Sequence, residues 1–156
     1  MRGQIQQVFI YLLTIIVVGL ILLIGYKSIG GIMKKGCEVE KATFKVDIES
    51  FISKYNSYGS VHTESLKAPC SYAQICFVDK DILDNNNFNS SNPIIESSVR
   101  AGIEENIFLV KKEVTDAVGF MEEINVDEEI VCINNTGGKF KIRFEGLGKE
   151  TGISRG

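Results

Sequence analysis

The chain has 156 residues, of which 44% are apolar and 24% are charged, a length that allows one ordinary domain. Its 17 Lys and Arg against 20 Asp and Glu give a net charge of −3, but four of the bases precede the first acid, Glu38. From Glu38 onward, 13 bases face 20 acids, a net charge of −7. Such a surface is unsuited to phosphate backbones, so no nucleic-acid partner is expected. The single His makes His-based catalytic or metal sites hard to build.

The N-terminal segment carries no charge over 24 residues ending at Tyr26 and is almost wholly apolar from Val8 onward. As a helix, its 19 residues from Val8 to Tyr26 would measure roughly 28 Å, close to the hydrocarbon thickness of a bilayer, about 30 Å. Apolar residues occur on every side of this helix, so one packing partner would leave much of it in water. Tyr11, Tyr26 and Lys27 lie where headgroup anchors are common. We expect residues 4–27 to form a transmembrane or filament-core helix in contact with membrane lipid.

Two conventional kinds of N-terminal processing fit this segment poorly. A secretory signal peptide cleaved at the small residues of 28–30 would have an apolar core of about 7–15 residues, shorter than this one. Lys27 also lies beside that cleavage site. A lipoprotein anchor at Cys37 would need small, apolar residues directly before this cysteine, but Lys34 and Lys35 place two charges there.

A Gly3-Gln4 junction, preceded by a basic residue, stands directly before the apolar run. In this part the sequence resembles archaeal type IV pilins and pilin-like proteins with a short-leader, class III signal. The resemblance implies that a prepilin peptidase cuts between Gly3 and Gln4, that residues 1–3 are a leader, and that the apolar helix self-associates in a filament. The family pattern has Ser or a similar residue at the third mature position and Glu at the fifth, where this chain has Gln6 and Val8. An uncleaved anchor remains the alternative.

Two patterns disagree on the orientation of the chain in a membrane. Arg2 and the terminal amine precede the apolar run, while Lys27, Lys34 and Lys35 follow it, a count that mildly favours a cytoplasmic C-terminal domain. All four cysteines also follow the run, and an even number in a small domain is typical of disulfides outside the cytoplasm. We therefore place residues 38–156 outside the cell, the side that the pilin resemblance also implies.

Glycine is expected to interrupt the continuation of this helix. Gly25, Gly30, Gly31 and Gly36 each cost about 1 kcal/mol relative to Ala in a helix interior. Residues 28–37 are therefore expected to form a loosened or kinked stalk.

After the stalk, residues 38–55 show helical spacing of apolar residues, although the alternation of Phe44, Val46 and Ile48 leaves a strand at the start open. Asn56 to Gly59 should end this helix. The residues of the expected apolar stripe are Phe44, Ile48, Phe51, Ile52 and Tyr55.

The remaining chain predicts short strands and one helix. Extended segments are expected at 61–66, 75–78 and 107–110, and a solvated loop is expected over the Asn-rich residues 84–92. A helix should begin at Pro93 behind a cap at Asn92 or Ser91. The apolar residues expected to face inward from it are Ile94, Ile95, Val99 and Ile103.

Near the C-terminus, the apolar runs 130–133 and 140–144 flank a turn that contains two glycines. The second run alternates apolar and basic residues, which indicates a β-hairpin with one wet face. The predicted fold class is therefore α+β: a single N-terminal transmembrane helix followed by a small, disulfide-stapled α+β domain with a C-terminal β-hairpin.

The cysteines Cys37, Cys70, Cys76 and Cys132 are the strongest chemical signal after the apolar run. Pairing Cys70 with Cys76 would leave Cys37 to pair with Cys132, although the other two pairings remain open. Closing the long loop would restrict the unfolded chain by about 4–5 kcal/mol. A zinc site built from the four thiolates is the rival, but no Cys-x-x-Cys pair is present.

Other candidate sites have ordinary explanations beside the functional ones. Asn89 and Asn134 stand in Asn-x-Ser/Thr glycosylation sequons. His62 and Glu64 are two residues apart in an expected strand and hence on one face, where a surface role is the default. The five acids within residues 122–129 lack the ligand spacing of a calcium-binding hand loop, so a solvated connector is expected.

Motifs for catalysis are missing from the sequence. The glycine-lysine segments 137–140 and 146–150 lack the spacing of phosphate loops and indicate turns. We expect no catalytic residue, no metal and no cofactor. The leading hypothesis is a membrane-anchored cell-surface structural protein of pilin-like design, located in the membrane or in an extracellular filament. The alternative is an uncleaved single-pass membrane protein presenting an extracytoplasmic binding domain of unknown ligand; a membrane-tethered enzyme ranks third.

Overall fold

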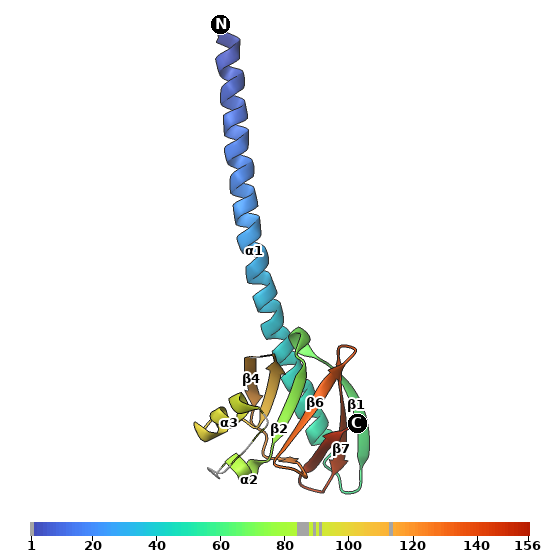
Figure 1. Cartoon of the computed structure of the whole chain (residues 1–156). Helices are drawn as coiled ribbons and strands as arrows, with labels where there is room; N and C mark the ends of the chain where they lie inside the picture. Colours follow the sequence, from blue (N-terminus) through green and yellow to red (C-terminus); the bar gives the residue numbers. More distant parts are fainter. Residues whose placement is uncertain (1, 84–87, 89, 91, 113) are drawn as a thin grey trace. The chain divides into compact units, whose positions relative to one another are not determined.

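A computed structural model describes residues 2–83, 88, 90, 92–112 and 114–156 of the chain, with side chains from 7–28 and from residue 35 onward. The chain divides into two compact units, Met1–Val39 and Glu40–Gly156. We call the second unit the head domain. Helix α1 (Arg2–Lys54) contributes residues to both units (Figure 1).

The expected loosening of the helix at its glycines is wrong. Helix α1 runs unbroken through Gly25, Gly30, Gly31 and Gly36. Once a helix is nucleated, each further residue adds one backbone hydrogen bond, so a long helix on both sides tolerates scattered glycines. The penalty of about 1 kcal/mol for each glycine lowers the stability of this part without ending it.

The C-terminal part of α1 confirms the predicted apolar stripe. Phe44, Ile48, Ile52 and Tyr55 are buried in the head core, because residues three and four apart lie on one side of a helix. Val46, which a strand would require to alternate with Phe44, is 62% exposed. Residues 44–48 are therefore helical, as the 3.6-residue spacing predicts, and do not form the strand that the alternation of Phe44, Val46 and Ile48 left open.

In the described part of the chain, the head domain is built on one mixed β-sheet. The sheet has the strand order β4-β3-β2-β6-β7-β8-β5, with β1 paired to β7 off this path. Pairing is antiparallel except between β5 and β8. The strands are β1 (Val61–Lys67), β2 (Gln74–Val78), β3 (Ile107–Lys111), β4 (Val114–Gly119), β5 (Ile124–Asn125), β6 (Ile130–Thr136), β7 (Lys139–Gly146) and β8 (Thr151–Arg155), and the short helices are η1 (Pro69–Ser71), α2 (Lys80–Leu83) and α3 (Pro93–Arg100).

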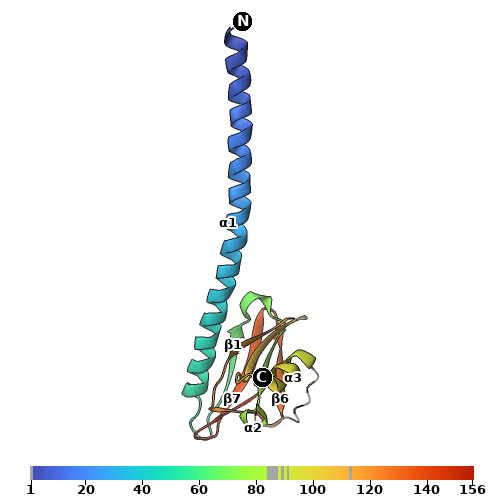
Figure 2. The ribbon, with the colours of Figure 1, turned by 90° about the vertical axis from the view of Figure 1, so that its left-hand side faces the viewer.

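The central strands are covered on both faces. Residues 40–54 of α1 lie on one side of the sheet, and α3 lies on the other (Figure 2). In β2, Ile75 and Phe77 belong to the core beneath α1, whereas Cys76 and Val78 belong to the core beneath α3. A strand that is buried on both faces has apolar residues at successive positions of its sequence. The strands predicted at 75–78 and 107–110 are confirmed as β2 and β3.

The predicted C-terminal hairpin is confirmed only at its turn. Gly137 and Gly138 connect β6 to β7 with φ values of +61° and +82°, as a two-residue type I′ turn requires. Only two residue pairs join these strands, because farther along β6 pairs with β2 and β7 pairs with β1 and β8. The apolar run of β6 needs cover on both faces, whereas β7 has one wet face, so the two strands enter different parts of the sheet.

Helix α3 begins where the sequence predicts. The side-chain oxygen of Asn92 accepts hydrogen bonds from the backbone nitrogens of Ile94 and Ile95 at 3.0 and 3.4 Å, and Pro93 stands in the first turn. Of the residues expected to face inward, Ile95 and Val99 are buried and Ile94 is half-buried. Ile103 follows the end of the helix at Arg100. Most of the loop expected over 84–92, with the alternative cap Ser91, lies outside the described residues.

The backbone of Gly146, at the end of β7, is hydrogen-bonded to the segment that follows α1. Its backbone nitrogen donates to the Ser60 carbonyl oxygen at 2.8 Å, and its own oxygen accepts from Gly59 at 2.9 Å. A Cβ atom at this position would overlap the carbonyl oxygen of Ser57 and lie 2.6 Å from that of Tyr55. Only glycine allows this close approach of two backbones.

Replacing Gly146 with Ala is therefore expected to lower the free energy of unfolding by about 3 kcal/mol, because backbone atoms must move to admit the methyl group. Chemical denaturation of the full chain in a non-ionic detergent measures this loss. Gly152→Ala in β8 is the matched control, since a Cβ there meets the Glu145 oxygen at an ordinary 3.4 Å. Equal stabilities of the two variants would contradict the prediction.

Candidate functional site

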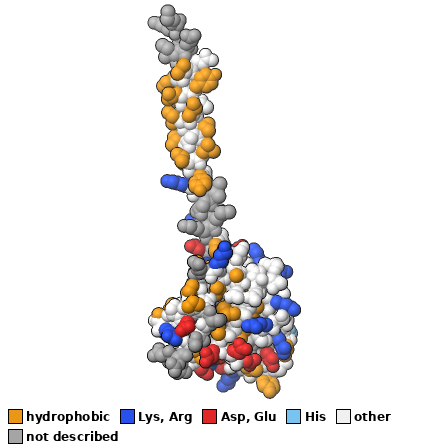
Figure 3. Space-filling view, in the orientation of Figure 1, with side chains coloured by type: hydrophobic (Ala, Val, Ile, Leu, Met, Phe, Trp, Pro, Cys, Tyr) orange, Lys and Arg blue, Asp and Glu red, His pale blue; other side chains and the backbone are white. Residues whose placement is uncertain are grey.

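The apolar segment Gln7–Ser28 of α1 is the candidate functional segment. Among the residues described, it is the one helix segment long and apolar enough to cross a membrane, and none of it is buried within the chain. Apolar side chains cover the visible face of this segment (Figure 3). Val8, Ile15 and Leu22 are 66%, 73% and 67% exposed. Each Å² of apolar surface left in water costs about 25 cal/mol. The segment therefore requires lipid or other apolar helices around it.

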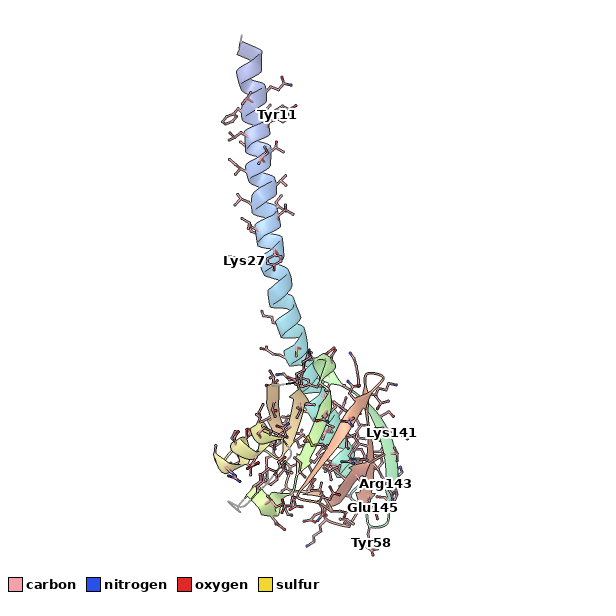
Figure 4. All side chains as sticks on the ribbon, in the orientation of Figure 1. Tyr11, Lys27, Tyr58, Lys141, Arg143 and Glu145 are labelled. Atoms are coloured by element: carbon pink, nitrogen blue, oxygen red, sulfur yellow. A yellow bond between two sulfur atoms is a disulfide. The ribbon has the colours of Figure 1, made fainter. Side chains whose placement is uncertain are left out.

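The polar residues of this segment suit an apolar environment. The Thr14 hydroxyl donates to the Ile10 carbonyl oxygen at 2.7 Å, so this polar group is satisfied within the helix. Tyr11 and Lys27 lie toward the two ends of the segment (Figure 4). Aromatic and basic side chains are common where a spanning helix meets the headgroups.

The predicted processing junction, Gly3-Gln4, lies in the first turn of α1, where the backbone is helical. Of the two sequons, Asn89 lies outside the described residues. Asn134 is exposed on β6, and its side-chain oxygen accepts a hydrogen bond from Gln74 at 2.6 Å. Both modifications remain predictions.

All four cysteines are disulfide-bonded, and of the three pairings left open by the sequence, the first considered, Cys70 with Cys76, is wrong. Cys76 is bonded to Cys132, and not to Cys70, because β2 and β6 are antiparallel neighbours whose register sets these two residues opposite each other. The spacing of cysteines along the chain carries no information on this register. The bridge restricts the unfolded chain by about 4 kcal/mol in the loop-entropy model. The zinc alternative does not apply to thiols that are bonded to each other.

His62 and Glu64 share one face of β1 as predicted, and both contact Tyr55. The rings of His62 and Tyr55 stack with centroids 4.2 Å apart, and the Tyr55 hydroxyl donates to Glu64 at 2.5 Å. His62 is exposed. These contacts hold the residue that follows α1 against strand β1.

The acidic segment 122–129 differs from a plain connector. Ile124 and Val126 are buried, and β5 within the segment pairs with β8. Sequence reasoning missed this strand because it has only two residues. Across the part of the chain that the structure covers, no three His, Cys, Asp or Glu side chains are grouped to hold a metal ion. The glycine-lysine segments 137–140 and 146–150 include the turns that join β6 to β7 and β7 to β8.

Two fully buried polar residues were not identified from the sequence. Asn106 donates to the Met121 carbonyl oxygen at 2.8 Å and accepts from the Met121 nitrogen at 2.9 Å. The Thr151 hydroxyl donates to the Ile52 carbonyl oxygen at 2.9 Å, which binds the C-terminal part of α1 to β8. Both contacts join residues far apart in the sequence, so no local pattern indicates them.

Tyr72, Asp116 and Lys41 form a polar cluster in the head domain. The Asp116 carboxylate accepts from the Tyr72 hydroxyl and from Lys41 Nζ at 3.2 Å. The Tyr72 hydrogen bond, with help from Lys41, lowers the pKa of Asp116. Burial, and then the Asp116 carboxylate, raises the pKa of Tyr72 to about 12. At neutral pH Asp116 is therefore an ionised hydrogen-bond acceptor, and Tyr72 is a neutral donor to it.

Glu150 belongs to a second cluster. It accepts from Lys80 Nζ at 2.5 Å and from the Asn125 amide at 3.1 Å, and these hydrogen bonds lower its pKa. A general acid at neutral pH needs a raised carboxyl pKa. The carboxylates of Asp116 and Glu150 have the opposite shift, which suits structural ion pairs.

Comparisons with protein-family models, curated proteins and solved structures find no match to this chain. The resemblance to pilins therefore remains a prediction carried by the N-terminal residues.

Replacing Val17 with Lys at the centre of the apolar segment should prevent stable insertion, because a Lys there costs about 2.5–3.5 kcal/mol. Flotation of the full chain with lipid vesicles should show at least a tenfold loss of the bound fraction. Val17→Leu is the matched control and should float like the wild type. Equal flotation of the Lys variant would contradict a spanning role for this segment.

Acid should weaken the head domain partly through Asp116. Its folded-state pKa lies below the ordinary 3.8, so its contribution is present above pH 3.8 and is lost as the pH falls through the lower folded value. Asp116→Asn should cost about 0.5–1 kcal/mol at pH 7, because the ion pair is partly solvent-exposed. The difference from wild type should shrink below pH 3.

Denaturation of the full chain in detergent at pH 7, 4 and 2.5 measures this trend. Asp127→Asn, which removes an exposed carboxylate, is the control. A deficit of Asp116→Asn that stays constant across the three pH values would show that the carboxylate charge is irrelevant.

Proposed function

We propose that this protein is a pilin-like structural subunit of the cell surface, held in a membrane or in a filament by its apolar N-terminal helix. The observation that carries the proposal is the exposure of the apolar side chains of Gln7–Ser28 within the chain. Association with lipid, or with the same helix in other copies, removes this surface from water. The head domain then serves as the soluble part of the subunit.

The disulfides of the chain support a location outside the cytoplasm. All four cysteines are in disulfides, and such bonds persist in oxidising compartments. Lys27 and Lys35, which follow most of the apolar segment, instead favour a cytoplasmic head domain. The disulfides outweigh these charges, because a reducing cytoplasm would cleave them.

The N-terminus of the mature protein provides the main test. The full gene is expressed with and without a prepilin peptidase in an archaeal or bacterial host, and the membrane-bound protein is sequenced from its N-terminus. We expect Gln4 as the first residue when the peptidase is present and Met1 when it is absent. Gly3→Val should block cleavage, while Gly19→Val, the same change inside the apolar segment, should not.

Other N-termini would select other functions. A mature chain that begins at Met1 despite the peptidase would favour the uncleaved anchor with a binding domain. A chain that begins at Gly31 would make the protein secreted. Regular fibres visible by electron microscopy after removal of detergent would support a filament subunit.

A further inference from the structure

The outer face of β1 and β7 carries a row of cations. Lys139, Lys141 and Arg143 alternate along β7 with buried apolar residues, so their side chains share the wet face. The sheet register sets Lys67 of β1 directly opposite Lys139. Figure 4 shows Lys141 and Arg143 along β7. We call Lys67, Lys139, Lys141 and Arg143 the basic face.

The basic face is only partly neutralised within the chain. Lys67 pairs with Glu40 at 3.0 Å and Arg143 pairs with Glu145 at 3.4 Å. Lys139 and Lys141 form no ion pair with any residue for which the structure gives side chains. Like charges set opposite each other across two strands repel by a few tenths of a kcal/mol or more, typically about 0.2–1. The face therefore favours an acidic partner.

The same head domain presents an acidic surface in the segment 122–129. The segment 122–129 exposes five carboxylates, and none of them belongs to an ion pair in the described part of the chain. Buried Ile124 and Val126 fix the backbone of the segment to the core. In Figure 3, acidic side chains gather along the lower part of the head domain and basic ones lie beside them. The acids are Glu122, Glu123, Asp127, Glu128 and Glu129.

We propose that the basic face of one copy docks on the acidic segment 122–129 of a second copy. The inference rests on the proposed function, because a contact between exposed charges is weak and needs copies already gathered by their apolar helices. A second copy offers five exposed carboxylates on a segment whose backbone is fixed by buried Ile124 and Val126, and charges of opposite sign on the two surfaces make them complementary.

The two sides of the contact are different surfaces of the same chain. When each copy uses its basic face on one neighbour and its acidic segment on another, the contacts are heterologous and generate rings or open helical arrays. Contact through charged side chains also sets the register between copies, because sliding would bring like charges together. The apolar helices would then supply affinity, and the head domains would select the arrangement.

Charge exchange tests this contact in the full chain. Wild-type protein, half of it labelled with ¹⁵N, is reconstituted at high density in lipid vesicles, so that the apolar helices keep the copies together, and is treated with a zero-length carbodiimide cross-linker. Mass spectrometry identifies links between labelled and unlabelled copies. We expect links from Lys139 or Lys141 to the segment 122–129. Their yield should fall several-fold between 50 and 500 mM salt, because the screening length shortens to a few Å.

Three variants then separate the two surfaces. The basic-face variant Lys141→Glu with Arg143→Glu, and the acidic-segment variant Glu128→Lys with Glu129→Lys, should each lose at least fivefold in intermolecular links. A chain carrying all four changes should regain links to within twofold of wild type, now from residues 128 and 129 to residues 141 and 143. The control Lys112→Glu with Lys149→Glu changes the net charge equally at exposed lysines off the basic face and should retain the links.

The outcomes distinguish this contact from the proposed function. Unchanged links in both double variants, or no recovery in the fourfold variant, would overturn the contact even if the chain still sediments as an oligomer without detergent. Polyglutamate that binds the wild type and not the basic-face variant, without links between copies, would assign the face to an acidic polymer instead. A full chain that is monomeric without detergent would overturn the proposed function itself. Thermal unfolding of each variant confirms that a loss of links comes from a folded head domain.

Discussion

The head domain depends on the burial of one side of α1 against its sheet. Strand β7 has one wet face, so its apolar residues need cover on the other, and α1 supplies it. Phe44 meets the ring of Phe140 edge to face at a centroid distance of 5.8 Å, and Phe51 lies 5.9 Å from Phe144. Each large side chain buried here contributes about 1.5–3 kcal/mol. The end of α1 is thus an internal element of the head domain.

One helix therefore meets two different requirements along its length. In Gln7–Ser28 the apolar residues occur all around the axis, and they need an apolar solvent on every side. In residues 40–54 they form a stripe, and the charged residues Lys41 and Lys45 lie outside it. The distribution of apolar residues, rather than their number, separates the part made for lipid or other helices from the part made for a sheet.

The sequence allowed the elements with strong local patterns to be predicted. The stripe on α1, the Asn92 cap of α3 and the apolar run of β2 each follow from a few neighbouring residues. Strand order and register depend on contacts between distant residues, so the Cys76–Cys132 bridge and the buried Asn106 could not be predicted. Persistence of the helix through Gly30 and Gly31 reflects cooperativity over many turns. The alternating cations of β7 were visible, but their alignment with Lys67 requires the pairing with β1.

The bond from Thr151 to the carbonyl oxygen of Ile52 has a mechanical consequence. Tension applied to the N-terminal part of the chain would reach the head domain through α1, whose last turns are held by the core and by β8. Pulling those turns out of the head domain requires the packed side chains of the α1 stripe to leave the core, as well as the loss of the bond to β8. The end of the helix is therefore anchored by the core itself and not by one hydrogen bond.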